Sequence, residues 1–129
     1  MIALLDTNAL YWWLDNPDRL GEEAQRTITN HSNSIVVSAV VAWELAIKTN
    51  LGKLKAQPLL EIWDVKLAEE GFTELAIDSA HAIRAGFLTR HHHHKDPFDR
   101  MLAAQALVNG WPILSADRVF ETYGVRRIW

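Results

Sequence analysis

The sequence predicts a three-layer α/β/α fold, in which helices cover both faces of a central, mostly parallel sheet of four to five strands. Short apolar runs alternate with helix-like segments along the whole chain, which is the pattern of successive strand–helix–strand units. The first run, Ile2–Leu5, contains no polar residue, as expected of a strand buried on both faces. The 129 residues show no linker and no internal repeat, so we expect one domain over residues 1–129.

Turn residues separate the elements near the start of the chain. After the first strand, the apolar and aromatic stretch Leu10–Leu14 closes at a turn, Asn16-Pro17-Asp18. Gly21–His31 has the polar composition of a surface helix. The β-branched run Ser34–Ser38, bounded by polar residues, predicts the second strand.

The later elements are bounded by residues that start or stop helices, such as proline in a first turn and glycine after a last one. The predicted helices are Ala39–Asn50, Pro58 to about Glu70, Ser79–Phe87, Phe98–Asn109 and Asp117–Tyr123. The predicted strands are Phe72–Ile77, Pro112–Ser115 and Val125–Ile128, and Thr89–Asp96 is expected to be a histidine-rich loop. Within the first of these helices, Val40, Trp43 and Ile47 recur at helical spacing.

Composition excludes several classes of protein. Without cysteine the chain has no disulfide, zinc ribbon, iron–sulfur cluster or thiol nucleophile. The net charge of −3 means that any binding of nucleic acid depends on a local patch or on metal ions. The apolar N-terminus is too short to span a bilayer and has no basic region typical of a secretory signal, so we expect a cytoplasmic protein without a membrane partner.

Four carboxylates are expected to meet at one edge of the sheet. Asp6 directly follows the first strand, and Asp117 follows the strand that ends at Ser115. Glu44 lies one and a half turns into the helix after the second strand, and Asp99 lies in the first turn of the helix before the fourth. Ligands of open parallel sheets bind beyond the carboxyl ends of the strands, where these side chains are placed.

Carboxylates that converge repel one another, and no basic residue is adjacent to Asp6 or Glu44 in the sequence. Hard oxygen ligands in this number favour Mg²⁺ or Mn²⁺, which support phosphodiester hydrolysis by activating water. Thr7, Asn8 and Ser115 offer neutral hydrogen-bonding groups beside the same site.

Each of these residues also has a purely structural interpretation. Asp6 and Asp117 could simply cap helices. Asp96 and Asp99 could stabilise the start of a helix, because negative charge there interacts favourably with the helix macrodipole. Glu44 lies in an apolar stretch, where it is either partly buried and functional or on the solvent face of its helix. The set of four is more specific than any member, because all four map to one sheet edge.

Basic and aromatic residues give weaker indications. The cluster from Arg90 to Lys95, together with Arg100, could face phosphates, so that Arg90, His94, Lys95 and Arg100 are candidate RNA contacts. The run His91–His94 could bind a transition metal, although such a run more often forms a solvated loop. The tryptophans are mostly candidates for the core, but Trp12, Trp13 and Trp129 together suggest self-association.

Taken in order, four segments resemble the PIN domain, and specifically the VapC-type toxins of prokaryotic type II toxin–antitoxin pairs. They are Leu4-Leu5-Asp6-Thr7-Asn8, Ser38 through Trp43-Glu44, His94-Lys95-Asp96-Pro97-Phe98-Asp99-Arg100 and Leu114-Ser115-Ala116-Asp117. The resemblance covers essentially the whole chain, and its most specific part is the third segment.

The resemblance implies an endoribonuclease that depends on Mg²⁺ or Mn²⁺ and hydrolyses RNA phosphodiester bonds. By matching position, Asp6, Glu44 and Asp99 would hold the metal, Asp117 would act directly or through water, and Asp96 would support the site from outside the metal ligands. Toxins of this family are usually inhibited by a cognate antitoxin protein, and they commonly form homodimers.

Two hypotheses from other classes stay open on the sequence alone. One is a metal-dependent phosphatase with Asp6 as nucleophile, although position 8 is asparagine where the Asp-x-Asp pattern needs aspartate. The other is a non-catalytic interaction module, such as a receiver-like domain. A dinucleotide-binding domain is disfavoured, because no glycine-rich turn follows the first strand.

Overall fold

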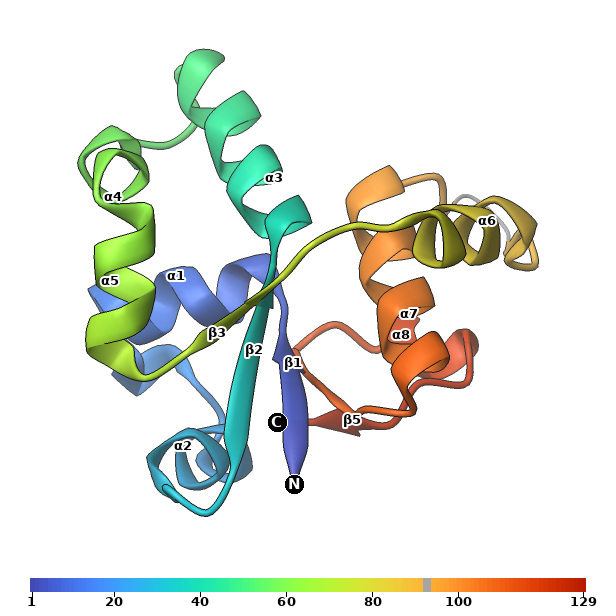
Figure 1. Cartoon of the computed structure of the whole chain (residues 1–129), viewed down its shortest axis with the longest axis horizontal. Coiled ribbons are helices and arrows are strands. Elements are labelled where there is room, and N and C mark those ends of the chain that lie inside the picture. Colours follow the sequence, from blue (N-terminus) through green and yellow to red (C-terminus); the bar gives the residue numbers. More distant parts are fainter. Residues whose placement is uncertain (92–93) are drawn as a thin grey trace.

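A five-stranded parallel sheet forms the centre of the molecule, as the computed structural model in Figure 1 shows for residues 1–91 and 94–129. The strand order is β3-β2-β1-β4-β5, and every neighbouring pair is parallel. The strands are β1 (Ile2–Leu5), β2 (Ser34–Ser38), β3 (Thr73–Leu75), β4 (Ile113–Leu114) and β5 (Arg127–Ile128). The predicted α/β/α architecture with a parallel sheet is confirmed.

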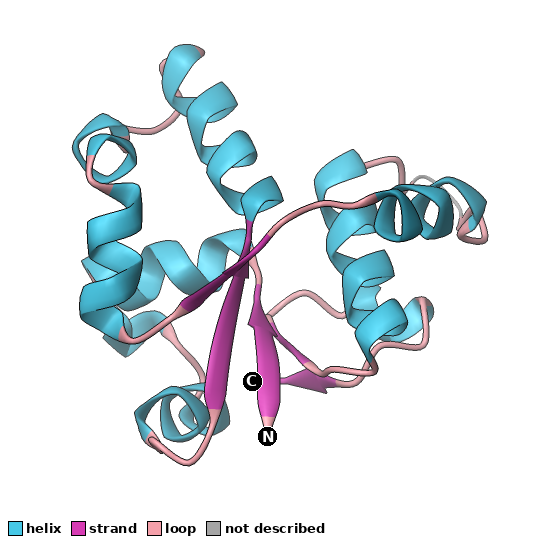
Figure 2. Ribbon diagram, in the orientation of Figure 1, coloured by secondary structure: helices cyan, strands magenta, loops and turns pink. Residues whose placement is uncertain are grey.

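Helices cover the sheet on both sides. In Figures 1 and 2, α1, α4 and α5 lie on one side of the central strands, and α6 and α7 lie on the other. The helices are α1 (Thr7–Asp15), α2 (Glu22–Thr29), α3 (Ala39–Asn50), α4 (Gln57–Glu61), α5 (Trp63–Glu70), α6 (Ser79–Phe87), α7 (Pro97–Asn109) and α8 (Val119–Thr122), with a 3₁₀ turn at Pro17–Arg19. Within the described part of the chain, none of these helices is both long and apolar enough to cross a bilayer.

The central strand β1 is buried because both of its faces are covered. Ala3, Leu4 and Leu5 are fully buried, and in the sheet Leu4 pairs with Val36 of β2 on one side and Ile113 of β4 on the other. Fully burying a leucine side chain is worth about 1.5–3 kcal/mol, so Leu4 and Leu5 contribute strongly to the core, whereas Ile2 at the start of the strand is exposed. The carboxyl end of β1 is thereby fixed between the ends of its two neighbours.

Several element boundaries differ from the predictions. The stretch Leu10–Leu14 belongs to a helix, α1, that begins directly after Asp6. The helix predicted from Pro58 to Glu70 is two helices, α4 and α5. Between them the backbone of Ile62 leaves the helical region (φ −116°, ψ 25°), and its N–H donates to the Leu59 carbonyl at 3.2 Å.

Three strands and two helices are shorter in the structure than the sequence predicts. The observed β3, β4 and β5 lie within the predicted strands but are shorter, and α2 and α8 are shorter than the helices predicted around them. Tertiary pairing decides these ends, because a strand extends only as far as a neighbour offers hydrogen bonds. By contrast β1, β2, α3 and α6 have the predicted bounds.

Candidate active site

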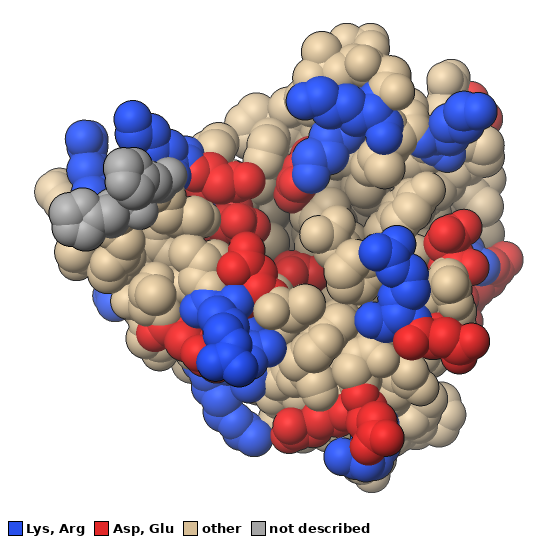
Figure 3. Space-filling model, turned by 180° about the vertical axis from the view of Figure 1, so that it is seen from behind, with Lys and Arg blue, Asp and Glu red and all other residues tan. Residues whose placement is uncertain are grey.

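The four predicted carboxylates reach one region at the carboxyl edge of the sheet. Asp6 follows β1, Asp117 follows β4, and Glu44 and Asp99 come from α3 and α7. In Figure 3, acidic side chains gather in a hollow between two lobes of the surface, and basic side chains flank them. The arrangement arises because parallel strands end at the same edge and the helices that follow them start there.

Asp6 is held by hydrogen bonds at both oxygens. It caps α1, where its Oδ1 accepts from the backbone N–H of Ala9 at 2.7 Å, and the Ser115 hydroxyl donates to its Oδ2. Burial raises the pKa of Asp6 to about 6; the charges of Glu44 and Asp117 add to the rise, and the two hydrogen bonds oppose it. Asp6 is therefore both a helix cap and a member of the acidic cluster.

Glu44 is buried, with 6% of its surface exposed, which decides against the solvent-face interpretation. Thr7 donates its hydroxyl to Glu44 Oε1 at 2.6 Å, and the Lys48 ammonium lies 2.5 Å from Oε2. Lys48 stands four residues after Glu44 on α3, a spacing that places the two side chains on the same helix face. One carboxylate of the cluster thus has a local counter-charge.

Asp99 lies at the start of α7, beside a second carboxylate. Asp96 caps the helix by accepting from the N–H groups of Phe98 at 2.9 Å and Asp99 at 3.1 Å. Burial raises the pKa of Asp99 to about 7, with the charges of Asp96, Asp117 and Glu44 adding to the rise and the His94 contact opposing it. Asp96 therefore combines its capping role with an electrostatic effect on Asp99.

Ser115 connects two of the carboxylates. Besides donating to Asp6, its Oγ accepts from the backbone N–H of Asp117 at 3.0 Å, and the residue is fully buried. Asp117 itself is exposed, and its Oδ1 accepts from the Val119 N–H at 2.9 Å at the start of α8. Asn8 is exposed in the first turn of α1, next to Thr7.

The donor set fits a hard divalent cation, although the side chains do not form a closed cage. Across the residues described, no three of the histidine, aspartate and glutamate side chains are close enough to hold an ion as they stand. The raised pKa values of Asp6 and Asp99 nevertheless show that negative charge is crowded and desolvated at this point. A cation bound there would relieve this cost, because it would offset the repulsion between the carboxylates.

The predicted basic residues have different environments. Arg90, His94, Lys95 and Arg100 all line one hollow of about 410 Å³, and His94 joins this hollow to the acidic cluster through its contact with Asp99. The Arg100 guanidinium is engaged within the protein, where it donates to the carbonyl of Leu88 at 2.9 Å and to two further carbonyls. Arg90 and Lys95 are exposed. Two members of the histidine run, His92 and His93, lie outside the described residues.

Two contacts of the site were missed by reasoning from the sequence. The Lys48 contact was detectable, because its i, i+4 spacing from Glu44 on a predicted helix is a sufficient signal. Tyr123 had no such signal. Its hydroxyl lies 2.5 Å from Nδ1 of His94, whose Nε2 lies 3.4 Å from Asp99 Oδ2, so residues far apart in the chain form one network.

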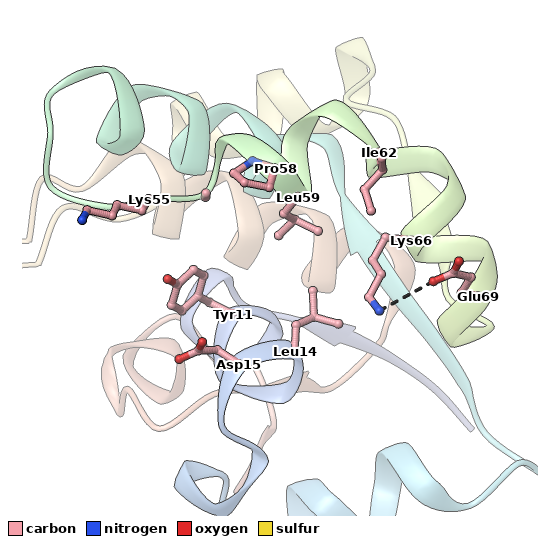
Figure 4. A pocket seen from close by; sticks show the side chains of 10 residues that line it. Tyr11, Leu14, Asp15, Lys55, Pro58, Leu59, Ile62, Lys66 and Glu69 are labelled. Atoms are coloured by element: carbon pink, nitrogen blue, oxygen red, sulfur yellow. Dashed lines mark ion pairs between the residues drawn. The ribbon is translucent and has the colours of Figure 1, made fainter.

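A separate hollow lies away from the carboxylates. It encloses about 330 Å³ between α1 and the α4–α5 pair, and Figure 4 shows Tyr11 and Leu14 on one side with Leu59 and Ile62 on the other. None of the predicted catalytic residues lines it.

Comparison with known proteins identifies related sequences and folds. The family model of the PIN domain matches residues 3–125. Ribonuclease VapC22 of Mycobacterium tuberculosis is 32% identical over 126 residues, which cover 94% of this chain and 91% of that protein.

Solved structures share the fold at lower identity. The structure of VapBC2 from Rickettsia felis, bound to a DNA fragment from the VapBC2 promoter, aligns over 100% of both chains with a TM-score of 0.66 and 18% identity. DNA-bound VapBC from Salmonella typhimurium aligns over 98% of this chain and 96% of that chain, with a TM-score of 0.70 and 22% identity.

Proposed function

The chain belongs to the PIN domain family, and from this premise we propose that it is a divalent-metal-dependent endoribonuclease, the toxin of a type II toxin–antitoxin pair. The observation that carries the proposal is the placement of Asp6, Glu44, Asp99 and Asp117 at the carboxyl edge of the sheet, where burial and the neighbouring carboxylates raise the pKa of Asp6 and of Asp99. The relative named as a ribonuclease, 32% identical over most of both chains, supports the same activity.

Asp6, Glu44 and Asp99 are the proposed ligands of Mg²⁺ or Mn²⁺, with Asp117 acting directly or through water. When bound, such an ion lowers the pKa of an attacking water and neutralises charge on the phosphate. The protein's own contribution is to fix the carboxylates: Thr7 holds Glu44 and the Ser115 hydroxyl holds Asp6.

The residues around the cluster have supporting roles in this proposal. Asp96 fixes the start of α7 and so the position of Asp99. Lys48 balances the charge of Glu44 while no metal is present. Arg90 and Lys95, exposed beside the cluster, are the proposed contacts to flanking RNA phosphates. His94 lies between these residues and Asp99.

We further propose that the protein acts in the cytoplasm, that a cognate antitoxin inhibits it and that it forms a homodimer. The VapBC names of the solved neighbours support a protein partner of this kind. The phosphatase hypothesis is less favoured because position 8 is asparagine where the Asp-x-Asp pattern needs aspartate, and the interaction-module hypothesis is less favoured because it gives no reason for the acidic cluster.

The proposal is tested by combining metal binding with RNA cleavage. The protein without antitoxin is titrated with Mn²⁺ by calorimetry, and total cellular RNA is incubated with it in Mg²⁺ or Mn²⁺. We expect wild-type protein to bind the ion and cut RNA. Asp99→Asn should weaken ion binding sharply and lower cleavage by at least about 100-fold, since it removes a charged ligand next to the reacting phosphate.

Asp64→Asn is the matched control, because Asp64 is an exposed aspartate of α5 outside the cluster, and it should leave both measurements unchanged. Full cleavage by a folded Asp99→Asn protein would refute the site assignment. Absence of cleavage by wild-type protein with any RNA, in either metal, would refute the proposed activity.

A further inference from the structure

One tryptophan stands out from the others by its exposure. All six tryptophans lie in the described part of the chain, and Trp43 alone among them is exposed, with 54% of its surface accessible. The indole N–H groups of Trp13 and Trp63 donate to glutamates, whereas that of Trp43 has no hydrogen bond to any described residue. The indole of Trp43 therefore offers both a flat apolar face and a free donor.

The exposed ring of Trp43 is nevertheless held in place. Its centroid lies 5.0 Å from that of Phe98, and the two rings meet edge to face at 78°. Phe98 is itself packed against the hydrophobic core. An edge-to-face pair of this kind contributes about 0.5–1.5 kcal/mol beyond the burial of area, which restrains the indole although the residue is 54% exposed.

Both residues of the aromatic pair are sequence neighbours of carboxylates in the acidic cluster. Trp43 immediately precedes Glu44 on α3, and Phe98 immediately precedes Asp99 on α7. The pair thus bridges the two helices that supply two of the proposed metal ligands. The indole is therefore placed one residue along the helix from one proposed metal ligand and in contact with the neighbour of another.

We propose that Trp43, supported by Phe98, is a stacking platform for one unpaired base of the RNA next to the phosphate that is cleaved; this inference rests on the proposed ribonuclease function. Proteins bind single-stranded RNA largely by stacking bases on aromatic side chains, which tolerates any base because each has a flat face. The site therefore favours single-stranded over duplex RNA.

A single base fits this surface better than an apolar segment of a protein. Along α3 and its end, the next large exposed apolar side chain among the described residues is Leu51, eight residues further on. Eight residues correspond to about 12 Å of helix, so Trp43 does not belong to a continuous exposed apolar stripe along α3. An apolar helix would need anchors at every turn to dock here.

The test measures RNA binding in an Asp99→Asn background, in which cleavage is expected to be at least about 100-fold slower. The probe is an unstructured, fluorescein-labelled RNA dodecamer in Mg²⁺, followed by anisotropy, together with versions that carry one abasic ribose at each position in turn. Trp43→Ala should raise the Kd about tenfold, and Trp43→Phe should stay within about threefold of its parent, because the phenyl ring still stacks. Phe87→Ala, which removes a more exposed aromatic residue of α6, should change nothing.

The abasic series separates stacking from a merely structural role. In the parent, loss of one particular base should weaken binding about tenfold, and in Trp43→Ala the loss of that base should cost nothing further. Equal Kd values and the same abasic profile with and without the indole would overturn the inference, leave the ribonuclease proposal intact and point to a protein partner for Trp43. Failure of the parent to bind any RNA would overturn the inference, while the ribonuclease proposal would still be decided by the cleavage assay with wild-type protein.

Discussion

Replacing Asp6 with asparagine should make the protein more stable at neutral pH, because the wild-type carboxylate is ionised in a buried site. The substitution keeps the local hydrogen bonds: the amide oxygen can still accept from the Ala9 N–H, and the amide nitrogen can donate to the Ser115 hydroxyl. What disappears is the negative charge, which Glu44 and Asp117 repel.

The magnitude follows from the pKa of Asp6, which burial raises from 3.8 to about 6. The folded state therefore holds this proton more tightly than the unfolded state, and the stability that the proton provides is lost as the pH rises from about 4 through 6. This difference in pKa between the folded and unfolded states lowers the free energy of unfolding of the wild type by about 3 kcal/mol at pH 7 and above. The raised pKa of Asp99, about 7, adds a further decline with pH in both proteins.

The assay is urea unfolding of metal-free protein, followed by tryptophan fluorescence, at intervals between pH 4 and pH 8. We expect the free energies of unfolding of Asp6→Asn and wild type to differ little at pH 4. At pH 7.5 the variant should be more stable by about 3 kcal/mol, or about 10 °C in Tm for a chain of this size. Saturating Mn²⁺ should shrink the difference, because it stabilises only the protein with the complete acidic cluster.

Asp64→Asn, on the exposed surface of α5, is the control and should shift stability by no more than about 0.5 kcal/mol at any pH. A stability difference between Asp6→Asn and wild type that is the same at pH 4 and pH 7.5 would refute the argument from burial. So would an asparagine variant that is less stable than wild type at pH 7.5.

Two further changes test other contacts of the structure. Lys48→Met removes the ammonium group that lies 2.5 Å from Glu44. Calorimetry should then show about tenfold tighter binding of Mn²⁺, because no side-chain cation competes for that carboxylate. Weaker binding would contradict this and would mean that the lysine orients Glu44 for the metal. Gly21→Ala should lower the free energy of unfolding in urea by about 2 kcal/mol, because a Cβ there would lie 2.4 Å from the backbone carbonyl carbon of Trp129. Gly86→Ala, on α6 with open space around it, should raise the free energy of unfolding by about 0.5–1 kcal/mol. Equal effects at the two positions would contradict this packing.

Much of the fold was predictable because its signals are local. A run of apolar residues predicted β1, and the helical spacing of Val40, Trp43 and Ile47 predicted α3. The placement of Asp6 and Asp117 at one edge followed from the ends of their strands. The break at Ile62 was not predictable, since neither glycine nor proline marks it and the residues on both sides favour a helix.

The sequence by itself determined which residue types stand at the ends of strands and the starts of helices, and hence that Asp6, Glu44, Asp99 and Asp117 belong to one edge. Capping and hydrophobic periodicity act over a few residues, so they can be read along the chain. Only the tertiary structure decided that Arg100 donates to carbonyls of the α6–α7 connection and that Trp43 stays exposed beside Phe98. Those outcomes depend on which surfaces of distant segments meet, and no local pattern specifies that.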